Sequence, residues 1–450
     1  MLLTKFLIMT TKLPTQPPTG MRDFLAEDMI KREYVISKVK RVFERFGFDP
    51  WETPAVERFD VLKGKYGEEE KLIYKFQDLG GRWLALRYDL TVPLARVVAR
   101  FPNLSKPIKR YQISRVWRYE RKQRGRYKEF WQCDVDIIGS DSMKADAEII
   151  AVIYTVLKEL GFKEFKIKIN NRKILTAIAI FSGVKKEKAI DVFRSIDKLD
   201  KIGLDGVKKE LKERGIPDDS ISKILDIISI KGKPIETLEK AKEFVKNIKE
   251  GREGISELEE LIKYLEYFEV NDSFYTIDLS LSRGLDYYTG PIFETVVEKP
   301  KIGSITGGGR YDKLIGLFIG KDIPATGTSF GIERIIDVMT ELKMLDFLPK
   351  TKTKVFIAVV DDSVLKDSIR IANMLRKSGI NTQIDLTKRN LKKQLSYADK
   401  MGISYVVIVG KKEIEKNMVT VKDLNKRKEE ILEVDKLISW FGDENDKKKS

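Results

Sequence analysis

Histidine is absent from all 450 residues of the chain. Its absence removes the commonest general base, the commonest metal ligand and every serine or cysteine triad. Any chemistry that this chain performs must therefore use carboxylates, arginines and bound ions.

Cysteine and long apolar runs are scarce as well. Cys133 is the single cysteine, which excludes an intramolecular disulfide and a cysteine-rich zinc site and fits a reducing compartment. No apolar run approaches the roughly 20 residues that a bilayer span requires, and the opening MLLTKFLIM is short for a signal peptide. We expect a cytoplasmic protein without membrane contacts, in which residues 1–12 are a disordered extension or an upstream start before Met9.

Positive charge, in contrast, is abundant. Lysine and arginine number 85 against 69 acidic residues, which gives a net charge of +16. Such an excess suggests a polyanionic partner such as nucleic acid, although a basic solvated surface would explain the charge equally well.

Hydrophobic spacing and composition divide the chain into segments. Val35, Val39 and Val42 recur at helical spacing and predict an amphipathic helix that ends near Gly47. The following FDPWETPAVE is extended in character, and Pro54 favours an edge strand or a covered interface. A lysine- and glutamate-rich helical pattern then interrupts the first domain, and alternating strand and helix patterns near the C-terminus predict a small α/β domain with a mostly parallel sheet. The expected parts are an extension (1–12), a discontinuous core domain (13–172 and 266–345), a helical insertion (173–265), an α/β domain (352–442) and a charged, disordered tail (443–450).

The segment RYQISRVWRYERKQRGRYKEFWQCDVDIIG predicts a long hairpin around a basic loop at Gly125. Strand alternation in its second half predicts one apolar face and one polar face. The apolar face is Trp131, Cys133, Val135 and Ile137; the polar face is Phe130, Gln132, Asp134 and Asp136. Together with Arg118 and Glu120 from the first half, the polar face could line a pocket for a small zwitterion beside a nucleotide, or could be the solvated side of an ordinary sheet.

Ten basic residues and one acid, Glu120, lie between Lys106 and Lys128. Simple solvation explains this density poorly, whereas arginine side chains match phosphate oxygens well. The loop therefore indicates phosphate contact.

Four further motifs have both a functional and a structural interpretation. Arg283 follows a strand and could neutralise a phosphate, while the tyrosines that follow could be core residues. The run of three glycines before Arg310 permits close backbone approach but lacks the ending of a P-loop. Arg334 stands in the first turn of a helix, where a cation needs an anionic or stacking partner. Thr91 could bind a ligand or merely cap a helix.

Together these residues resemble the class II aminoacyl-tRNA synthetases, and specifically the histidyl-tRNA synthetase family, over residues 14–440. FGFDPWETPAVE looks like motif 1, RVWRYE through KEFWQCDVDIIG like motif 2, and GTSFGIER like motif 3. LSRGLDYYTGPIFE, GGGRYD, PPTGMRDF and RYDLTVPLAR resemble the histidine-specific members. The resemblance implies an α+β fold: a catalytic domain with an antiparallel sheet, a helical insertion domain and a C-terminal α/β anticodon-binding domain. It also implies a homodimer through the motif 1 region.

The resemblance further implies roles for individual residues. Arg118 and Arg283 would act in catalysis, and Gln123 and Arg124 would lie near the tRNA acceptor end. The residues implied for ATP are Arg118, Glu120, Arg126, Phe130 and Arg334. The residues implied for histidine are Asp89, Thr91, Arg118, Gln132, Asp136, Arg283, Tyr287 and Tyr288.

The activity implied by the family is ligation of histidine to tRNA-His, with ATP as a substrate, Mg²⁺ on its phosphates and no prosthetic group. Metal ligands are not assigned. The attacking carboxylate is already ionised, so alignment and charge neutralisation can supply the rate without a histidine base. Two alternatives are a non-catalytic regulatory paralogue of the ATP phosphoribosyltransferase complex and a class II synthetase for another amino acid.

Overall fold

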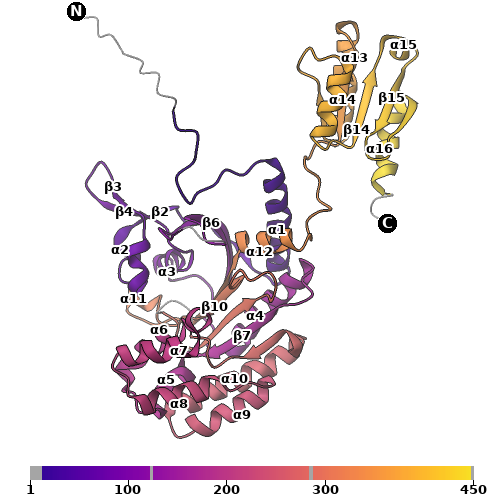
Figure 1. Cartoon of the computed structure of the whole chain (residues 1–450). Coiled ribbons are helices and arrows are strands. Elements are labelled where there is room, and N and C mark those ends of the chain that lie inside the picture. The colour runs from indigo at the N-terminus through magenta and orange to yellow at the C-terminus, as the bar shows by residue number, and fades with distance from the viewer. Residues whose placement is uncertain (1–12, 122–124, 283–286, 447–450) are drawn as a thin grey trace, which may run out of the picture. The chain divides into compact units, whose positions relative to one another are not determined.

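A computed structural model describes residues 13–121, 125–282 and 287–446 of the chain (Figure 1). The described residues form two compact units. The first contains residues 34–344 with the preceding segment through Asp23, and the second contains residues 24–33 and the chain from Leu345 onward.

An eight-stranded sheet organises the first unit. Its strand order is β1-β5-β6-β11-β10-β9-β7-β8. The strands are β1 (Asp49–Pro50), β5 (Ile108–Trp117), β6 (Glu129–Ile138), β7 (Lys166–Asn171), β8 (Tyr275–Ile277), β9 (Pro291–Val296), β10 (Thr306–Arg310) and β11 (Ala325–Gly331). All six central strands pair antiparallel, and only the edge strands β1 and β8 pair parallel with their neighbours. The α+β fold class with an antiparallel catalytic sheet is thereby confirmed.

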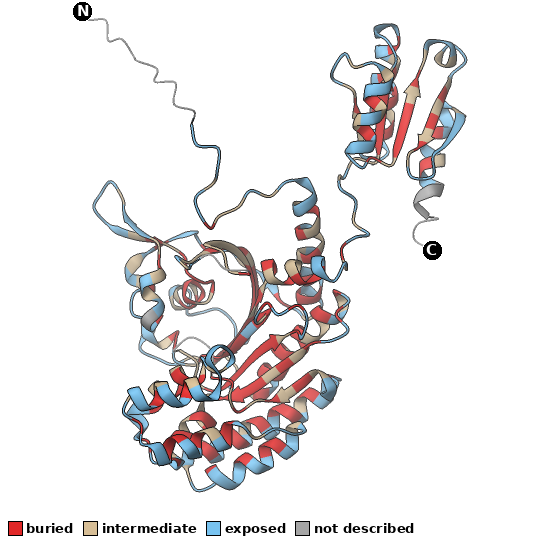
Figure 2. Cartoon of the chain, viewed as in Figure 1, coloured by how far each residue is buried: buried red, intermediate tan, exposed pale blue. Residues whose placement is uncertain are grey.

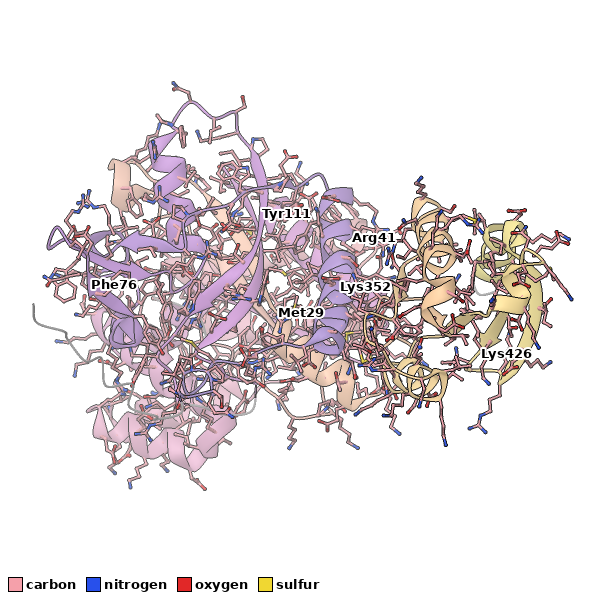
Figure 3. The ribbon with its side chains drawn as sticks, turned by 90° about the horizontal axis from the view of Figure 1, so that it is seen from above. Met29, Arg41, Phe76, Tyr111, Lys352 and Lys426 are labelled. Carbon is pink, nitrogen blue, oxygen red and sulfur yellow. The ribbon has the colours of Figure 1, made fainter. Side chains whose placement is uncertain are left out.

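The predicted hairpin is the pair β5 and β6, which run antiparallel from Ile108↔Ile138 to Trp117↔Glu129. Its apolar face packs on helices. Phe43 of α1 (Ala26–Arg45) contacts the rings of Tyr111 and Phe330 at centroid distances of 5.7 and 5.6 Å, and Tyr111 Oη donates a hydrogen bond to Glu44 (3.0 Å). Figure 3 shows Tyr111 beside this helix. The sheet also packs against α4 (Met143–Glu159) and α12 (Ile332–Glu341).

A small sheet lies before the hairpin in sequence, with strand order β2-β4-β3. It consists of β2 (Val56–Arg58), β4 (Trp83–Leu86) and β3 (Lys75–Gln77), next to α2 (Phe59–Leu62) and α3 (Thr91–Arg100). Phe76 projects from this sheet and is exposed (Figure 3). Pro54 itself lies between β1 and β2, and the edge strand near it is β1, a few residues earlier. The alternative of a covered interface stays a prediction.

Helices fill the chain between β7 and β8. They are α5 (Arg172–Phe181), α6 (Ala189–Ile196), α7 (Leu199–Glu213), α8 (Asp218–Ile228), α9 (Pro234–Val245) and α10 (Lys249–Tyr267). Figure 2 shows their buried sides turned to one another and their exposed sides turned outward, as amphipathic helices require. Helix α10 packs on α4, α5 and α9, which joins this helical block to the sheet domain.

The second unit contains a five-stranded sheet of order β13-β12-β14-β15-β16. Its elements are β12 (Val355–Val359), α13 (Leu365–Lys377), β13 (Thr382–Ile384), α14 (Leu391–Lys400), β14 (Tyr405–Val409), α15 (Lys411–Ile414), β15 (Met418–Asp423), β16 (Lys428–Glu433) and α16 (Leu437–Asp446). The prediction of a mostly parallel sheet is wrong, because β15 and β16 add two antiparallel pairs to the two parallel ones. Helix α16 continues to Asp446 and so overlaps the tail expected at 443–450.

No helix in the described parts of the chain combines the length and apolar character that a membrane span requires.

Candidate active site

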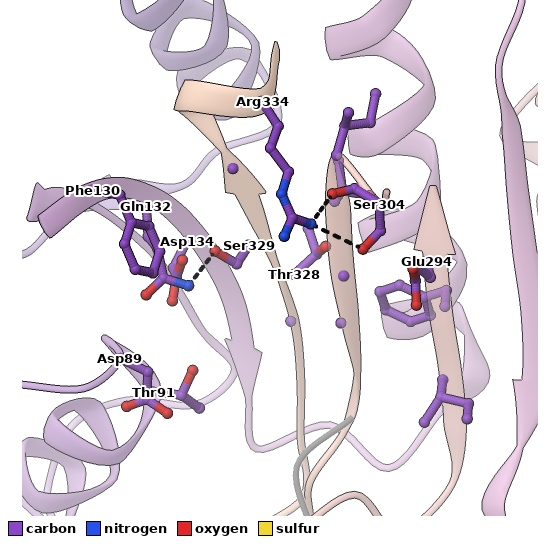
Figure 4. Close-up of a pocket in the computed structure, with 18 of the residues that line it drawn as sticks. Asp89, Thr91, Phe130, Gln132, Asp134, Glu294, Ser304, Thr328, Ser329 and Arg334 are labelled. Atoms are coloured by element: carbon purple, nitrogen blue, oxygen red, sulfur yellow. Dashed lines mark hydrogen bonds between the residues drawn. The ribbon is translucent and has the colours of Figure 1, made fainter. Parts of the chain in front are cut away.

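The first unit contains a pocket of about 420 Å³ on the polar face of the large sheet (Figure 4). This volume lies within the range of roughly 300–1,000 Å³ that is usual for small-molecule sites. The predicted site residues that line it are Asp89, Thr91, Arg118, Glu120, Arg126, Phe130, Gln132, Asp136, Tyr287, Tyr288 and Arg334. The remaining predicted residues, Gln123, Arg124 and Arg283, lie outside the described residues.

The polar face of β6 lines the pocket. Phe130, Gln132 and Asp134 line the cavity (Figure 4) and alternate with the half-buried Trp131 and the buried Cys133 and Val135. The polar face is therefore the wall of a pocket, and the interpretation as a solvated outer face is wrong.

Arg118 lies among aromatic and acidic neighbours. Its Nε donates to the Tyr88 carbonyl (3.1 Å), and its guanidinium lies over the rings of Tyr88 (4.3 Å) and Phe130 (5.3 Å). Burial alone lowers the pKa of Arg118, but Tyr88, Glu69 and nearby carboxylates outweigh it and raise the pKa. The side chain is thus a permanent cation, held in one direction at the pocket wall.

Other cations of the pocket have polar partners. Arg126 Nη1 donates to Glu120 Oε2 (2.9 Å) across the basic loop. Arg334, in the first turn of α12, donates to the carbonyls of Gly125 (3.0 Å) and Ser304 (2.6 Å). These carbonyl contacts stabilise a cation near a helix N-terminus, where the dipole disfavours one.

Asp89 precedes α3 and is almost fully buried. Its Oδ1 accepts hydrogen bonds from Tyr66 Oη (3.0 Å) and the Val92 amide (3.0 Å). Burial raises the pKa of Asp89, while these bonds and Arg118 oppose the rise. Asp89 therefore accepts a backbone N–H from the first turn of α3, so Thr91 is not needed as the helix cap. The Thr91 side chain instead forms a hydrogen bond with the Tyr287 side chain.

Asp136 is constrained from both neighbouring strands. It lies opposite Arg110 on β5 and Gly327 on β11 in the sheet register. Arg110, fully buried, places Nη2 2.9 Å from Asp136 Oδ2, and Tyr311 Oη donates to Oδ1 (2.5 Å). A Cβ on Gly327 would stand 2.0 Å from Oδ1, so only glycine leaves room for the carboxylate in this position. Burial raises the pKa of Asp136, and Arg110 opposes that rise.

The GGGRYD motif has a structural explanation in this geometry. A Cβ on Gly308 would stand 2.2 Å from the Gly327 carbonyl, and one on Gly309 would stand 2.9 Å from Tyr288 Cδ1. Arg310 is buried against Asp146 of α4 and donates to the Ser140 carbonyl (3.0 Å). The glycines thus permit close strand packing, and the motif's tyrosine, Tyr311, reaches Asp136.

Gln132 and Asp134 share one hydroxyl group. Gln132 Nε2 donates to Ser329 Oγ (2.9 Å; Figure 4), and Ser329 also hydrogen-bonds Asp134, which it faces in register. Because a serine hydroxyl has one hydrogen, accepting from Gln132 leaves that hydrogen for the Asp134 carboxylate. The Gln132 amide oxygen is then turned away from Ser329 and is available to a donor.

Sequence and structure comparisons now identify the relatives of this chain. The family described as Histidyl-tRNA synthetase matches residues 20–335, and the Anticodon binding domain family matches residues 354–444. The histidine--tRNA ligase of Aeropyrum pernix is 46% identical over 90% of this chain and 93% of its own length. That of Pyrococcus furiosus is 42% identical over 94% and 97%. The crystal structure of histidyl-tRNA synthetase from Nostoc sp. PCC 7120 superposes with a TM-score of 0.85 at 33% identity, covering 96% of this chain and 100% of that one.

The chain belongs to the histidyl-tRNA synthetase family. The resemblance drawn from the motifs is therefore confirmed, and ATP is a substrate of the reaction that this family catalyses. The second unit contains its anticodon-binding domain.

In this histidyl-tRNA synthetase fold, the basic cluster of residues 106–128 is not one phosphate-binding surface. Arg110 is turned inward to Asp136, and Lys109 pairs with Glu148 (2.7 Å). Arg118 and Arg126 line the pocket. Only part of the cluster is therefore available to nucleotide or tRNA phosphates.

Tyr287 and Tyr288 are both core residues and pocket residues, so the structural and the functional interpretation each hold in part. Their rings meet edge-on at 5.1 Å and pack on a buried apolar cluster, while both residues line the pocket. Burial raises the pKa of each hydroxyl, so both remain protonated donors.

Sequence reasoning missed several residues of this site: Tyr66, Arg110, Tyr311 and Ser329. Strand alternation predicts the correct face for Asp134 but gives it no role. Its alternation with Gln132 and Asp136 was a sufficient signal to include it, whereas the partners on other strands depend on register.

Proposed function

We propose that this chain activates L-histidine with ATP to histidyl-adenylate, releases diphosphate, and transfers the histidyl group to the 3′ end of tRNA-His. The observation that carries the proposal is a single pocket with two kinds of lining. Arginine cations stand near its basic loop, and buried acceptor oxygens of Asp89, Gln132 and Asp136 stand on its floor. Such a pocket suits an anionic nucleotide beside an amino acid with several N–H donors.

In the first step, the histidine carboxylate attacks the α-phosphorus and the bond to diphosphate breaks. Arg118 is held by Tyr88 and can contact both the carboxylate and the α-phosphate. Arg283 would lie across the α-phosphate and stabilise charge in the transition state. Alignment and charge neutralisation by these arginines supply the rate.

For ATP, Phe130 and Arg334 would hold the adenine ring, one by stacking and the other through its planar guanidinium. Glu120 and Arg126, which pair with each other, would contact the base and the phosphates.

For histidine, Asp89, Thr91 and Gln132 would receive the α-ammonium group. Asp136 and Tyr288 would hydrogen-bond the imidazole, with Tyr287 beside them. A substrate without these donors would leave buried acceptors unpaired, which is costly.

Magnesium is expected on the ATP phosphates. Among the described residues, no three carboxylate or cysteine side chains lie close enough together to hold a metal ion. Mg²⁺ would neutralise charge on the ATP phosphates.

Further parts of the chain would serve tRNA and assembly. Gln123 and Arg124 would lie at the acceptor end, and the helices α5–α10 would clamp the acceptor arm. A homodimer would form through the motif 1 region around α1 and β1, and the protein would act in the cytoplasm.

The regulatory-paralogue alternative receives less support. A structure described as an ATP phosphoribosyltransferase regulatory subunit/histidyl-tRNA synthetase from Bacillus halodurans superposes with a TM-score of 0.74, but its 24% identity shows the fold alone. This chain retains Arg118 and Arg334 in the pocket and an anticodon-binding domain.

Amino-acid-dependent ATP–pyrophosphate exchange tests the proposal, with each of the twenty amino acids supplied singly. We expect exchange with histidine alone, lost in Arg283→Ala and retained in Arg58→Ala, a matched control at an exposed arginine of β2. Exchange with another amino acid, or with none, would contradict the proposal.

A further inference from the structure

Among the described residues, three side-chain oxygens on β6 and one just before α3 are buried in the pocket without a hydrogen-bond partner. They are Asp89 Oδ2, Gln132 Oε1, Asp134 Oδ1 and Asp136 Oδ2; the last is ion-paired with Arg110. Buried acceptors without donors are rare, because each has lost its hydrogen bonds to water without a replacement. All four lie on residues of one cavity, which indicates a ligand rich in N–H groups.

Histidine offers such donors, and the proposed function assigns only some of the acceptors. The α-ammonium group has three N–H bonds, for which Asp89 and Gln132 provide two of the four atoms. The proposed function assigns Asp136 to one imidazole nitrogen and Tyr288 to the other, so Asp134 can reach the ring at the nitrogen that Asp136 also approaches. Asp134 and Asp136 point to the same face of β6, two residues apart.

The charges around these two carboxylates do not balance. Arg110 of β5 is paired with Asp136, and the groups that face Asp134 are Arg110, Asp136, Asp89 near α3, Tyr288 before β9 and Ser329 of β11. Arg118 compensates the negative charge around Asp89. Among the described residues, the close donor to Asp134 is the Ser329 hydroxyl, which carries no charge.

We propose that Asp134 is a further histidine-binding residue, and that its carboxyl group and the imidazole of the substrate hold one proton between them. This inference rests on the proposed function and deepens it. The pocket would thereby select its substrate by the ability of the side chain to bind a proton as well as by its shape.

Titration properties of both groups suit this sharing. Burial, and then the neighbouring Asp136, raises the pKa of Asp134 to about 7, with Arg110 and Ser329 opposing the rise. A free imidazole has a pKa of about 6.5. Both groups therefore change protonation in the same pH range before they meet, and a pair that holds one proton carries no net charge.

Sharing one proton gives histidine binding a defined pH dependence. Above pH 7 the empty Asp134 and the free imidazole are both deprotonated, so binding must take a proton from solution. Affinity then falls about tenfold for each further pH unit. Below about pH 6.5 both partners are protonated, so binding must release a proton and affinity falls again.

Isothermal titration calorimetry with histidine, in buffers of different ionisation enthalpy, tests this directly. Between pH 7 and 8.5 we expect the full-length protein to lose affinity about tenfold per unit and to take up close to one proton per histidine at pH 8. In Asp134→Asn, which keeps the size of the side chain, we expect the alkaline loss to flatten to less than about twofold per unit and proton uptake to disappear. A wild-type affinity independent of pH in this range, or equal proton uptake by the variant, would overturn the inference.

A milder variant keeps the test decisive if Asp134→Asn fails to fold. Ser329→Ala removes a hydrogen bond that favours the Asp134 anion, so its pKa rises and the alkaline limb moves to higher pH. If the alkaline loss of histidine affinity began at the same pH in Ser329→Ala as in the unaltered protein, the inference would be contradicted. Failure of the proposed function would look different, because the unaltered protein would then neither bind histidine nor support histidine-dependent exchange.

Discussion

At the scale of single residues, Asp136 shows how a recognition carboxylate receives a fixed direction. Arg110 and Tyr311 each engage one of its oxygens, and Gly327 leaves space for it. Strand alternation predicts that Asp136 faces a pocket. It does not predict its partners, since Arg110 has the sequence context of a basic cluster and becomes an interior residue only through the register of β5 with β6.

Removing the Tyr311 hydroxyl should therefore weaken histidine recognition selectively. In Tyr311→Phe, Asp136 loses one donor and can turn away from the substrate. Hydrogen bonds to charged groups are worth about 1.5–3 kcal/mol, so we expect the KM for histidine to rise at least about tenfold in ATP–pyrophosphate exchange. The KM for ATP should stay within about twofold.

The control for this variant is Tyr275→Phe, at a buried tyrosine of β8 outside the pocket. It should change neither KM. A Tyr311→Phe protein in which the two KM values rise together would instead indicate a general disturbance of the fold.

At the scale of elements, the sequence predicts strands best where apolar and polar residues alternate regularly and one face is buried throughout. The β5–β6 hairpin has ten-residue strands with clear alternation, and both its existence and its faces were predicted correctly. The hairpin of β15 and β16 was missed because β16 (KEEILE) is mostly exposed and charged, so no apolar face marks it as a strand. Its position at the edge of the sheet comes from pairing with β15.

One buried ion pair joins two elements of the first unit, Arg310 of β10 and Asp146 of α4. Both side chains are at most 3% exposed. Removing Asp146 takes away the buried partner of Arg310 and leaves it the more exposed Asp312 (3.2 Å). Asp146→Leu should therefore cost about 3 kcal/mol and lower the melting temperature by several degrees. Adding Arg310→Met to that variant should recover part of the loss.

Calorimetric melting of both variants measures this. Asp218→Ala is the control, since its pair with Lys212 is about two-thirds exposed on each side and should contribute less than about 1 kcal/mol. Equal destabilisation by Asp146→Leu and Asp218→Ala would show that the buried pair has no special role.

At the scale of the whole molecule, the charged residues of the pocket differ in kind from those outside it. The pocket combines arginines with buried carboxylates, whereas no lysine of the described residues is buried. The chain as a whole carries a net charge of +16. Composition alone could not tell a nucleic-acid partner from a basic surface. The family matches over residues 20–335 and 354–444 supply the missing reason for a tRNA partner.

This division predicts that salt affects the two substrates differently. Contacts with tRNA phosphates release counterions, so tRNA affinity falls steeply as salt rises, whereas charges inside a buried pocket are screened little. Between about 50 and 200 mM KCl we expect the KM for tRNA-His in aminoacylation to rise at least about tenfold, and the KM for histidine in exchange to change less than about twofold. If both constants rose in parallel, the exposed lysines would not act through tRNA phosphates, and the excess charge would be a solvated surface after all.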